Sequence, residues 1–92
     1  MKKYIVIAYD IEKDRKRREV SKLLEAWGKR VNKSVFECFL SDTGLKKLKV
    51  KLEKKVKKGT DSILLYPLCG TCIDKIERYG CPAPEREVVK IF

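Results

Sequence analysis

The chain has 92 residues, room for one domain (residues 1–92), and its 23 Lys and Arg against 13 Asp and Glu give a formal charge of +10. A cationic surplus this large favours a polyanionic partner, most simply nucleic acid, because each neutralised phosphate releases counterions. No stretch approaches the roughly 20 apolar residues of a membrane span, and the first apolar run is too short for a signal peptide, so we expect a cytoplasmic protein without membrane contact.

The first predicted element is a strand from Tyr4 to Tyr9, whose apolar run contains no turn residue. Such a run is typical of a central strand that is buried on both faces. A helix is predicted to begin near Asp14, and Gly28 is predicted to end it with a left-handed stop. Its apolar face recurs at helical spacing at Val20, Leu23, Leu24 and Trp27.

A second strand is predicted over residues 30–40. Its alternation lapses from Ser34 to Phe36, so we expect a kink or bulge that divides it into two short strands. Residues 41–43, Ser-Asp-Thr, offer N-caps for a second helix, which Gly59 is predicted to end. The apolar stripe of this helix is Leu45, Leu48, Leu52 and Val56, and most of its remaining surface is lysine.

A third apolar strand is predicted from Ser62 to Tyr66, central in the sheet and closed by Pro67. Residues 69–84 are predicted to be irregular, with one or two helical turns between Ile73 and Tyr79. A last strand is predicted at Glu87–Phe92. This order is the βαββαβ pattern of an α+β, ferredoxin-like sandwich, in which the helices cover one face of an antiparallel sheet.

Asp10 follows the first strand directly and has two interpretations. It caps the turn before the first helix, together with Asp14, or it is a hard oxygen ligand for Mg²⁺ or another divalent cation such as Mn²⁺. The chain has no His, so the usual general base and the usual zinc ligand are both missing. Mg²⁺ commonly uses one or two carboxylates, so a two-fold dimer with two adjacent Asp10 side chains would supply a site.

A basic tract opens the first helix: Lys13, Arg15, Lys16, Arg17 and Arg18. Cations in a first helical turn oppose the helix dipole by roughly 0.3–1 kcal/mol each. A solvated face is the ordinary explanation of a charge run, but this unfavourable placement favours phosphate binding beside Asp10.

Cys69 and Cys72 form a CxxC motif, which suggests half of a zinc site or a redox pair. A full zinc site would also need Cys81 and Cys38, at a spacing that matches no standard module. A disulfide, a redox module centred on the motif, and buried or idle thiols are further interpretations.

Four sequence features resemble, in order, the Cas two family of small CRISPR-associated endonucleases. They are the strand ending in Tyr9-Asp10, the pair Arg17-Arg18, the segment Arg30–Glu37 and the segment Asp61–Leu68. The resemblance implies a ferredoxin-like homodimer whose C-terminal strand packs on the partner's sheet, with a metal site on Asp10 at the dimer cleft. It also implies metal-dependent cleavage of RNA or DNA, and a part in spacer acquisition for antiviral defence with a CRISPR integrase subunit as partner.

By position, the resemblance places Tyr9, Arg17, Arg18, Arg30, Ser34 and Phe36 around that site. We therefore expect a metal at Asp10 and catalytic roles for Asp10, Arg17, Arg18 and Ser34. The residues expected to bind nucleic acid are Lys13, Arg15, Lys16, Arg17, Arg18 and Arg30. The alternative function is a non-catalytic scaffold that binds double-stranded DNA and bridges integrase subunits during spacer integration.

Overall fold

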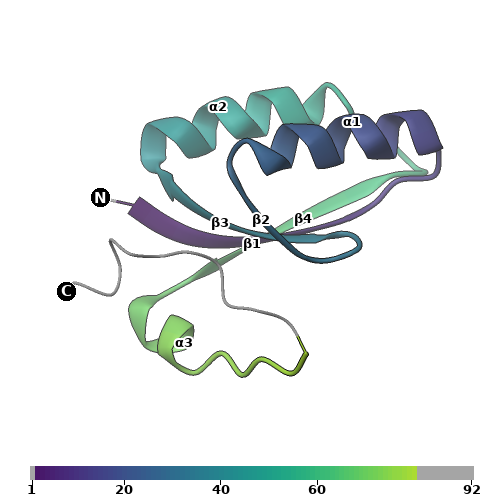
Figure 1. The fold of residues 1–92 in the computed structure, drawn as a ribbon. Helices are drawn as coiled ribbons and strands as arrows, with labels where there is room; N and C mark the ends of the chain where they lie inside the picture. Colours follow the sequence, from purple (N-terminus) through teal and green to yellow (C-terminus); the bar gives the residue numbers. More distant parts are fainter. Residues whose placement is uncertain (1, 81–92) are drawn as a thin grey trace.

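The computed structural model describes residues 2–80, which form four strands and three helices (Figure 1). In chain order they are β1 (Lys2–Asp10), α1 (Asp14–Glu25), β2 (Gly28–Asn32), β3 (Val35–Ser41), α2 (Asp42–Glu53), β4 (Ser62–Leu68) and α3 (Gly70–Asp74). All strand pairs are antiparallel, in the order β2-β3-β1-β4. The predicted ferredoxin-like α+β fold is confirmed, whereas the predicted strand Glu87–Phe92 lies outside the described residues.

The core lies between the sheet and the helices α1 and α2, which run side by side over one face of the sheet (Figure 1). We call this the helix-covered face. Because side chains alternate along a strand, every second residue of β1 and β3 points toward the helices. The buried members of this core include Ile5, Ile7, Tyr9, Val20, Leu24, Phe36, Cys38, Leu40, Leu48 and Leu52. The helical spacing predicted for α1 and α2 thus places their apolar stripes on the sheet.

The opposite side of the sheet, which we call the open face, is covered unevenly. Here α3 lies below the sheet (Figure 1). By contrast, Leu64 and Tyr66 of β4 are 52% and 49% exposed. The prediction that this strand is central is wrong for the described part of the chain, where β4 pairs with β1 alone. The strand also continues through Pro67 to Leu68, because an edge strand tolerates a residue without an N–H group.

Gly28 does not end α1, so that prediction is wrong. The helix ends at Glu25, the C-cap Ala26 keeps a right-handed conformation, and Gly28 already belongs to β2. A Cβ atom at Gly28 would lie 2.4 Å from the Sγ of Cys38 and 2.4 Å from the carbonyl oxygen of Glu37. Glycine is therefore required here by the close approach of β2 and β3 rather than by a turn.

The second predicted strand divides as expected. A turn at Lys33 and Ser34 separates β2 from β3, and their register shifts between Arg30 and Asn32. The predicted cap of α2 is also confirmed, since the Oγ of Ser41 accepts a hydrogen bond from the Gly44 N–H at 3.1 Å.

Two helix ends differ from their predictions. Helix α2 stops at Glu53, so Val56 lies beyond it, and Gly59 takes its positive φ in the turn that follows. Helix α3 spans Gly70–Asp74, earlier than the predicted turns between Ile73 and Tyr79. None of the described helices has the length and apolarity that a membrane crossing requires.

Candidate functional site

Asp61, in the loop before β4, fixes the junction between β1 and α1. Its Oδ1 accepts a hydrogen bond from the Glu12 N–H at 3.1 Å, and its Oδ2 accepts one from the Lys57 N–H at 2.9 Å. These backbone donors, Lys57 first and Glu12 second, hold the pKa of Asp61 below its usual range because they stabilise the charged form. The bond to Lys57 also connects the turn after α2 to the loop before β4. Sequence reasoning missed this role, although an Asp after Gly-Thr is a turn signal.

Asp10 ends β1 opposite Ser62 of β4, and its side chain is exposed. The cap interpretation is wrong, because the N-cap of α1 is Lys13 and no side chain caps that helix. Within residues 2–80, the Asp10 carboxylate makes neither a hydrogen bond nor an ion pair. Asp61 performs the structural task at this junction, so Asp10 is a carboxylate without a structural partner in the described part of the chain.

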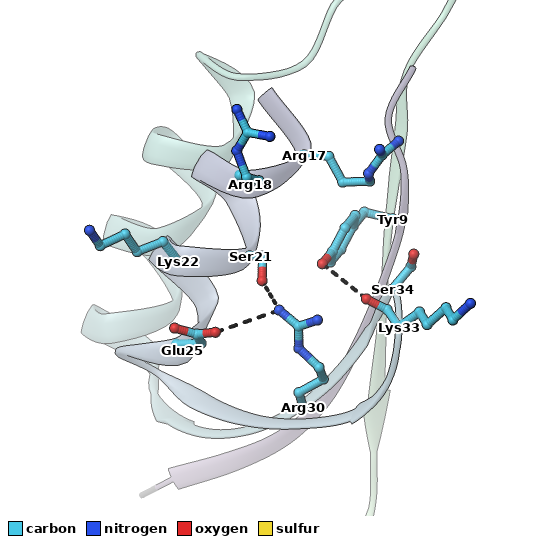
Figure 2. A pocket seen from close by; sticks show the side chains of 9 residues that line it. All are labelled: Tyr9, Arg17, Arg18, Ser21, Lys22, Glu25, Arg30, Lys33 and Ser34. Carbon is cyan, nitrogen blue, oxygen red and sulfur yellow. Dashed lines mark hydrogen bonds and ion pairs between the residues drawn. The ribbon is translucent and has the colours of Figure 1, made fainter. Parts of the chain in front are cut away.

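A groove of about 750 Å³ lies between α1 and the β2–β3 hairpin (Figure 2). We call it the basic groove. Its lining residues are Tyr9, Arg17, Arg18, Ser21, Lys22, Glu25, Arg30, Lys33 and Ser34. Cations therefore outnumber the single carboxylate, that of Glu25, along its walls. A concave surface with this charge attracts the phosphates of a nucleic-acid strand.

Arg30 is held in place by three neighbours in the groove. Its guanidinium donates a hydrogen bond to the Oγ of Ser21 and lies 3.5 Å from the Oε2 of Glu25 (Figure 2). Its Cζ also lies 5.3 Å from the ring centroid of Phe36, a cation–π contact. Arg30 thus braces α1 against the sheet, and much of its donor capacity is already used.

Arg17 is likewise engaged, since it donates to the Ile11 carbonyl oxygen at 3.1 Å and pairs with Asp14. By contrast, the side chains of Arg18, Lys22 and Lys33 make no hydrogen bond or ion pair with any residue in the described range 2–80. These three cations are the ones in the groove that remain available to a phosphate.

The structure brings some predicted site residues together and separates others. Arg17, Arg18, Arg30 and Ser34 line the basic groove, together with Tyr9. Asp10 does not line it, because alternation along β1 directs Tyr9 to the helix-covered face and Asp10 to the open face. Within one protomer, the groove and the carboxylate therefore lie on opposite faces of the sheet.

The remaining members of the basic tract, Lys13, Arg15 and Lys16, lie outside the lining of the basic groove. Arg15 pairs with Glu19 at 3.4 Å, one helical turn further along α1. These residues extend the positive field around the groove without shaping it.

The described residues contain no cluster of three or more Cys, Asp or Glu side chains that would hold a metal. Mg²⁺ sites in proteins often use one or two carboxylates and complete the shell with water and substrate phosphate.

A second groove, of about 780 Å³, runs between α2 and the edge strand β4, and we call it the edge groove. Its floor is apolar, with Leu52, Val56, Ile63 and Leu65, and lysines and acidic residues form its rim. The exposed edge of β4 beside it offers unpaired backbone groups along the described sheet.

Comparisons with known proteins agree with one another. The family described as CRISPR associated protein Cas2 matches residues 1–76. A CRISPR-associated endoribonuclease Cas2 of Synechocystis is 43% identical over 84% of this chain and 84% of its own. A CRISPR-associated endonuclease Cas2 of Thermus thermophilus is 34% identical over 99% of this chain and 98% of its own.

Solved structures give the same result. The crystal structure of Streptococcus pyogenes Cas2 is 29% identical, with a TM-score of 0.75 over 84% of this chain and 99% of that chain. A hypothetical protein from Thermus thermophilus is 35% identical, with a TM-score of 0.81 over 92% of this chain and all of that chain. The family match includes Asp10 and every residue of the basic groove.

Proposed function

This chain belongs to the Cas2 family of CRISPR-associated proteins, and we propose that it is a metal-dependent endonuclease that hydrolyses phosphodiester bonds in RNA or DNA during spacer acquisition. The observation that carries this proposal is the state of Asp10. Asp10 is exposed at the end of a central strand. The carboxylate that hydrogen-bonds to the backbone at the junction of β1 and α1 is that of Asp61, not that of Asp10. An exposed carboxylate without hydrogen-bond partners in the described chain is available to bind a cation.

We propose further that the protein is a homodimer formed through its open faces. Leu64 and Tyr66 expose about half of their surface on the same face that carries Asp10. The edge groove and the edge of β4 suit an added apolar strand, and the terminal segment Glu87–Phe92 of a second copy has that composition. Pairing two open faces would bring both Asp10 side chains to one interface.

Two Asp10 carboxylates fit the ligand preference of Mg²⁺ or Mn²⁺, which bind oxygen and keep several sites for water and phosphate. A cation bound there would supply Lewis-acid activation of the scissile phosphodiester. Arg18, Lys22 and Lys33 neutralise phosphates along the strand, while Arg17 and Arg30 keep the groove in shape. The Ser34 hydroxyl lines the same groove and can donate a hydrogen bond to a phosphate oxygen.

A second function, a non-catalytic scaffold for double-stranded DNA, is favoured by one specific observation. The basic groove and Asp10 occupy opposite faces of the sheet, so phosphate binding in the groove does not require the carboxylate. In that role the protein would hold DNA while a CRISPR integrase subunit performs the chemistry.

The variant Asp10→Asn tests the nuclease, because it keeps the side-chain shape and removes the charge. The charge-matched control is Asp42→Asn, which removes an exposed carboxylate whose partner is Lys3 at 3.2 Å. With Mg²⁺ present, we expect Asp10→Asn to cleave RNA and DNA at background rates and Asp42→Asn to cleave like the wild type. If purified Asp10→Asn cleaves at the wild-type rate, the nuclease proposal is wrong.

Spacer acquisition by the same variants separates the two functions in the cell. Acquisition that persists in Asp10→Asn while cleavage is lost would assign the cellular role to the scaffold. Acquisition that disappears together with cleavage, with DNA binding retained, would assign it to the nuclease.

A further inference from the structure

The CxxC motif places two thiols within reach of each other on the side of the sheet opposite α1 and α2. Cys69 directly follows β4, and Cys72 lies in α3, which is below the sheet (Figure 1). Their Sγ atoms are 3.3 Å apart. Both side chains are exposed. No core packing has to be broken for either sulfur to move or to meet a small molecule from solvent.

The backbone already holds the two residues in a closed turn. The Ile73 N–H donates to the Cys69 carbonyl oxygen at 3.0 Å, and Ile73 itself is buried. A disulfide requires sulfurs about 2.05 Å apart and Cα atoms within about 7 Å. The two sulfurs are 3.3 Å apart in this turn, so we expect a small approach of the side chains to be enough for the bond to form.

The two thiols are chemically unequal. Hydrogen bonds from the Cys72 backbone N–H and then from its thiol hold the pKa of Cys69 below the usual value for a thiol. The same sulfur–sulfur hydrogen bond raises the pKa of Cys72, because it stabilises the protonated form of that residue. Cys69 is therefore the better nucleophile near neutral pH, and Cys72 is the thiol that can resolve an intermediate formed on it.

Cys38 provides an internal contrast. It is 1% exposed in the core beneath α1 and α2, and burial raises its pKa to about 11. It lies on the helix-covered face, so the sheet separates it from the motif. The described residues contain no third ligand that would complete a metal site with Cys69 and Cys72.

We propose that Cys69 and Cys72 form a redox-active dithiol that reduces small-molecule disulfides and closes to an intramolecular disulfide. The Cys69 thiolate attacks one sulfur of the small disulfide, which breaks its S–S bond, forms a mixed disulfide and releases one thiolate. Cys72 then loses its proton to solvent and attacks the Cys69 sulfur, which releases the second thiolate. In sum, two electrons and two protons pass from the protein to the small disulfide and give two free thiols.

We expect closure of this bond to leave the rest of the segment in place. The segment is fixed at its far end by Arg78, which donates to the Oε2 of Glu37 at 3.0 Å and to the hydroxyl of Tyr4 at 3.1 Å. Both Glu37 and Tyr4 are buried, so this clamp belongs to the sheet and not to the motif. We therefore expect the oxidised and reduced proteins to share one fold.

The test is the reaction of the full, reduced chain with oxidised glutathione, followed by alkylation of the remaining thiols and peptide mass spectrometry. We expect the peptide that contains residues 69–72 to become lighter by two hydrogen atoms and to escape alkylation. In Cys72→Ser, glutathione should stay attached to Cys69. In Cys69→Ser, reaction at neutral pH should be slower than in the wild type, because the thiol with the lowered pKa is gone.

Two control variants complete the test. Cys81→Ser removes the other cysteine near the motif in sequence, and it should still form the bridge. Asp10→Asn should react like the wild type, which separates this inference from the proposed nuclease. The inference is overturned if Cys69 and Cys72 both remain open to alkylation, if Cys69 pairs with Cys81 instead, or if the purified chain holds zinc that protects both thiols until a chelator is added.

Discussion

The two faces of the sheet contrast in how completely the described chain covers them. On the helix-covered face, Ile7 of β1 is fully buried, whereas on the open face Leu64 of the neighbouring strand is 52% exposed. The first face carries the core that stabilises the protomer. The second carries Asp10, exposed apolar side chains and an unpaired strand edge within the described sheet. This difference places most of the protomer's core on one face, and we propose that assembly and metal binding depend on the other.

The largest effect on stability should come from the helix-covered face. Ile7→Ala removes buried methyl groups beneath the helices and should lower the free energy of unfolding by about 2–5 kcal/mol. Leu64→Ala is the matched change on the open face. It should lower the free energy of unfolding by less, and only at protein concentrations that support a dimer. Urea unfolding at low and high protein concentration measures both. If both variants lose the same free energy of unfolding at every protein concentration, the two faces do not differ as described.

The next effect concerns the covered corner of the open face, where Arg78 and Glu37 form a pair with little exposure. Glu37→Gln keeps the side-chain shape but removes the charge that pairs with Arg78. It should lower the free energy of unfolding by about 1–3 kcal/mol, because buried polar groups lose hydrogen bonds. Glu77→Gln is the control, since Glu77 is exposed and bonds only to the exposed Tyr79 among the described residues. Similar melting temperatures for both variants would show that this corner contributes nothing to stability.

A smaller, pH-dependent effect should come from Asp61. Its pKa is lower in the folded chain than in the unfolded one, so its contribution is present above the unfolded value of about 3.9 and is lost as pH falls through the folded value. Asp61→Asn lacks this contribution, so its stability should fall less steeply than that of the wild type on acidification below about pH 4. Thermal unfolding from pH 7 to pH 2 measures the two slopes. Parallel curves would contradict the assigned role of the Asp61 carboxylate.

The smallest effect should be on the salt dependence of nucleic-acid binding, which we assign to the helix-covered side. Arg18→Ala should reduce the slope of log affinity against log salt by about 1, because one phosphate contact is lost. Lys46→Ala, on the exposed surface of α2, should change the slope less. Titrations of one RNA and one DNA duplex at several salt concentrations provide the slopes. An Arg18→Ala slope equal to that of the wild type would remove Arg18 from the binding surface.

Local patterns predicted much of the fold. The start of α1, the Ser41 cap and the division of the second strand all depend on neighbouring residues, and the structure confirms them. The apolar run from Ser62 to Tyr66 is predicted to lie at the centre of the sheet, but it forms an edge strand in the sheet of residues 2–80. A run that is apolar on both faces looks the same whether its own chain or a partner covers the second face, so periodicity alone does not distinguish them.

Long-range contacts explain what sequence reasoning missed in the site. Gly28 is required by the backbone of β3, and Asp61 bonds to Glu12, far away in the sequence. The separation of Asp10 from the basic groove follows from strand alternation, which the sequence did contain. It was missed because residues close in sequence were expected to form one site.

The most direct test of the central claim is the stoichiometry of Mn²⁺ binding by electron paramagnetic resonance, with wild type and Asp10→Asn under conditions that keep the chains associated. Two open faces that bring their Asp10 carboxylates together should bind one Mn²⁺ for every two chains, and Asp10→Asn should lose that site. One Mn²⁺ per chain, or equal binding by Asp10→Asn, would contradict a metal shared between the two open faces.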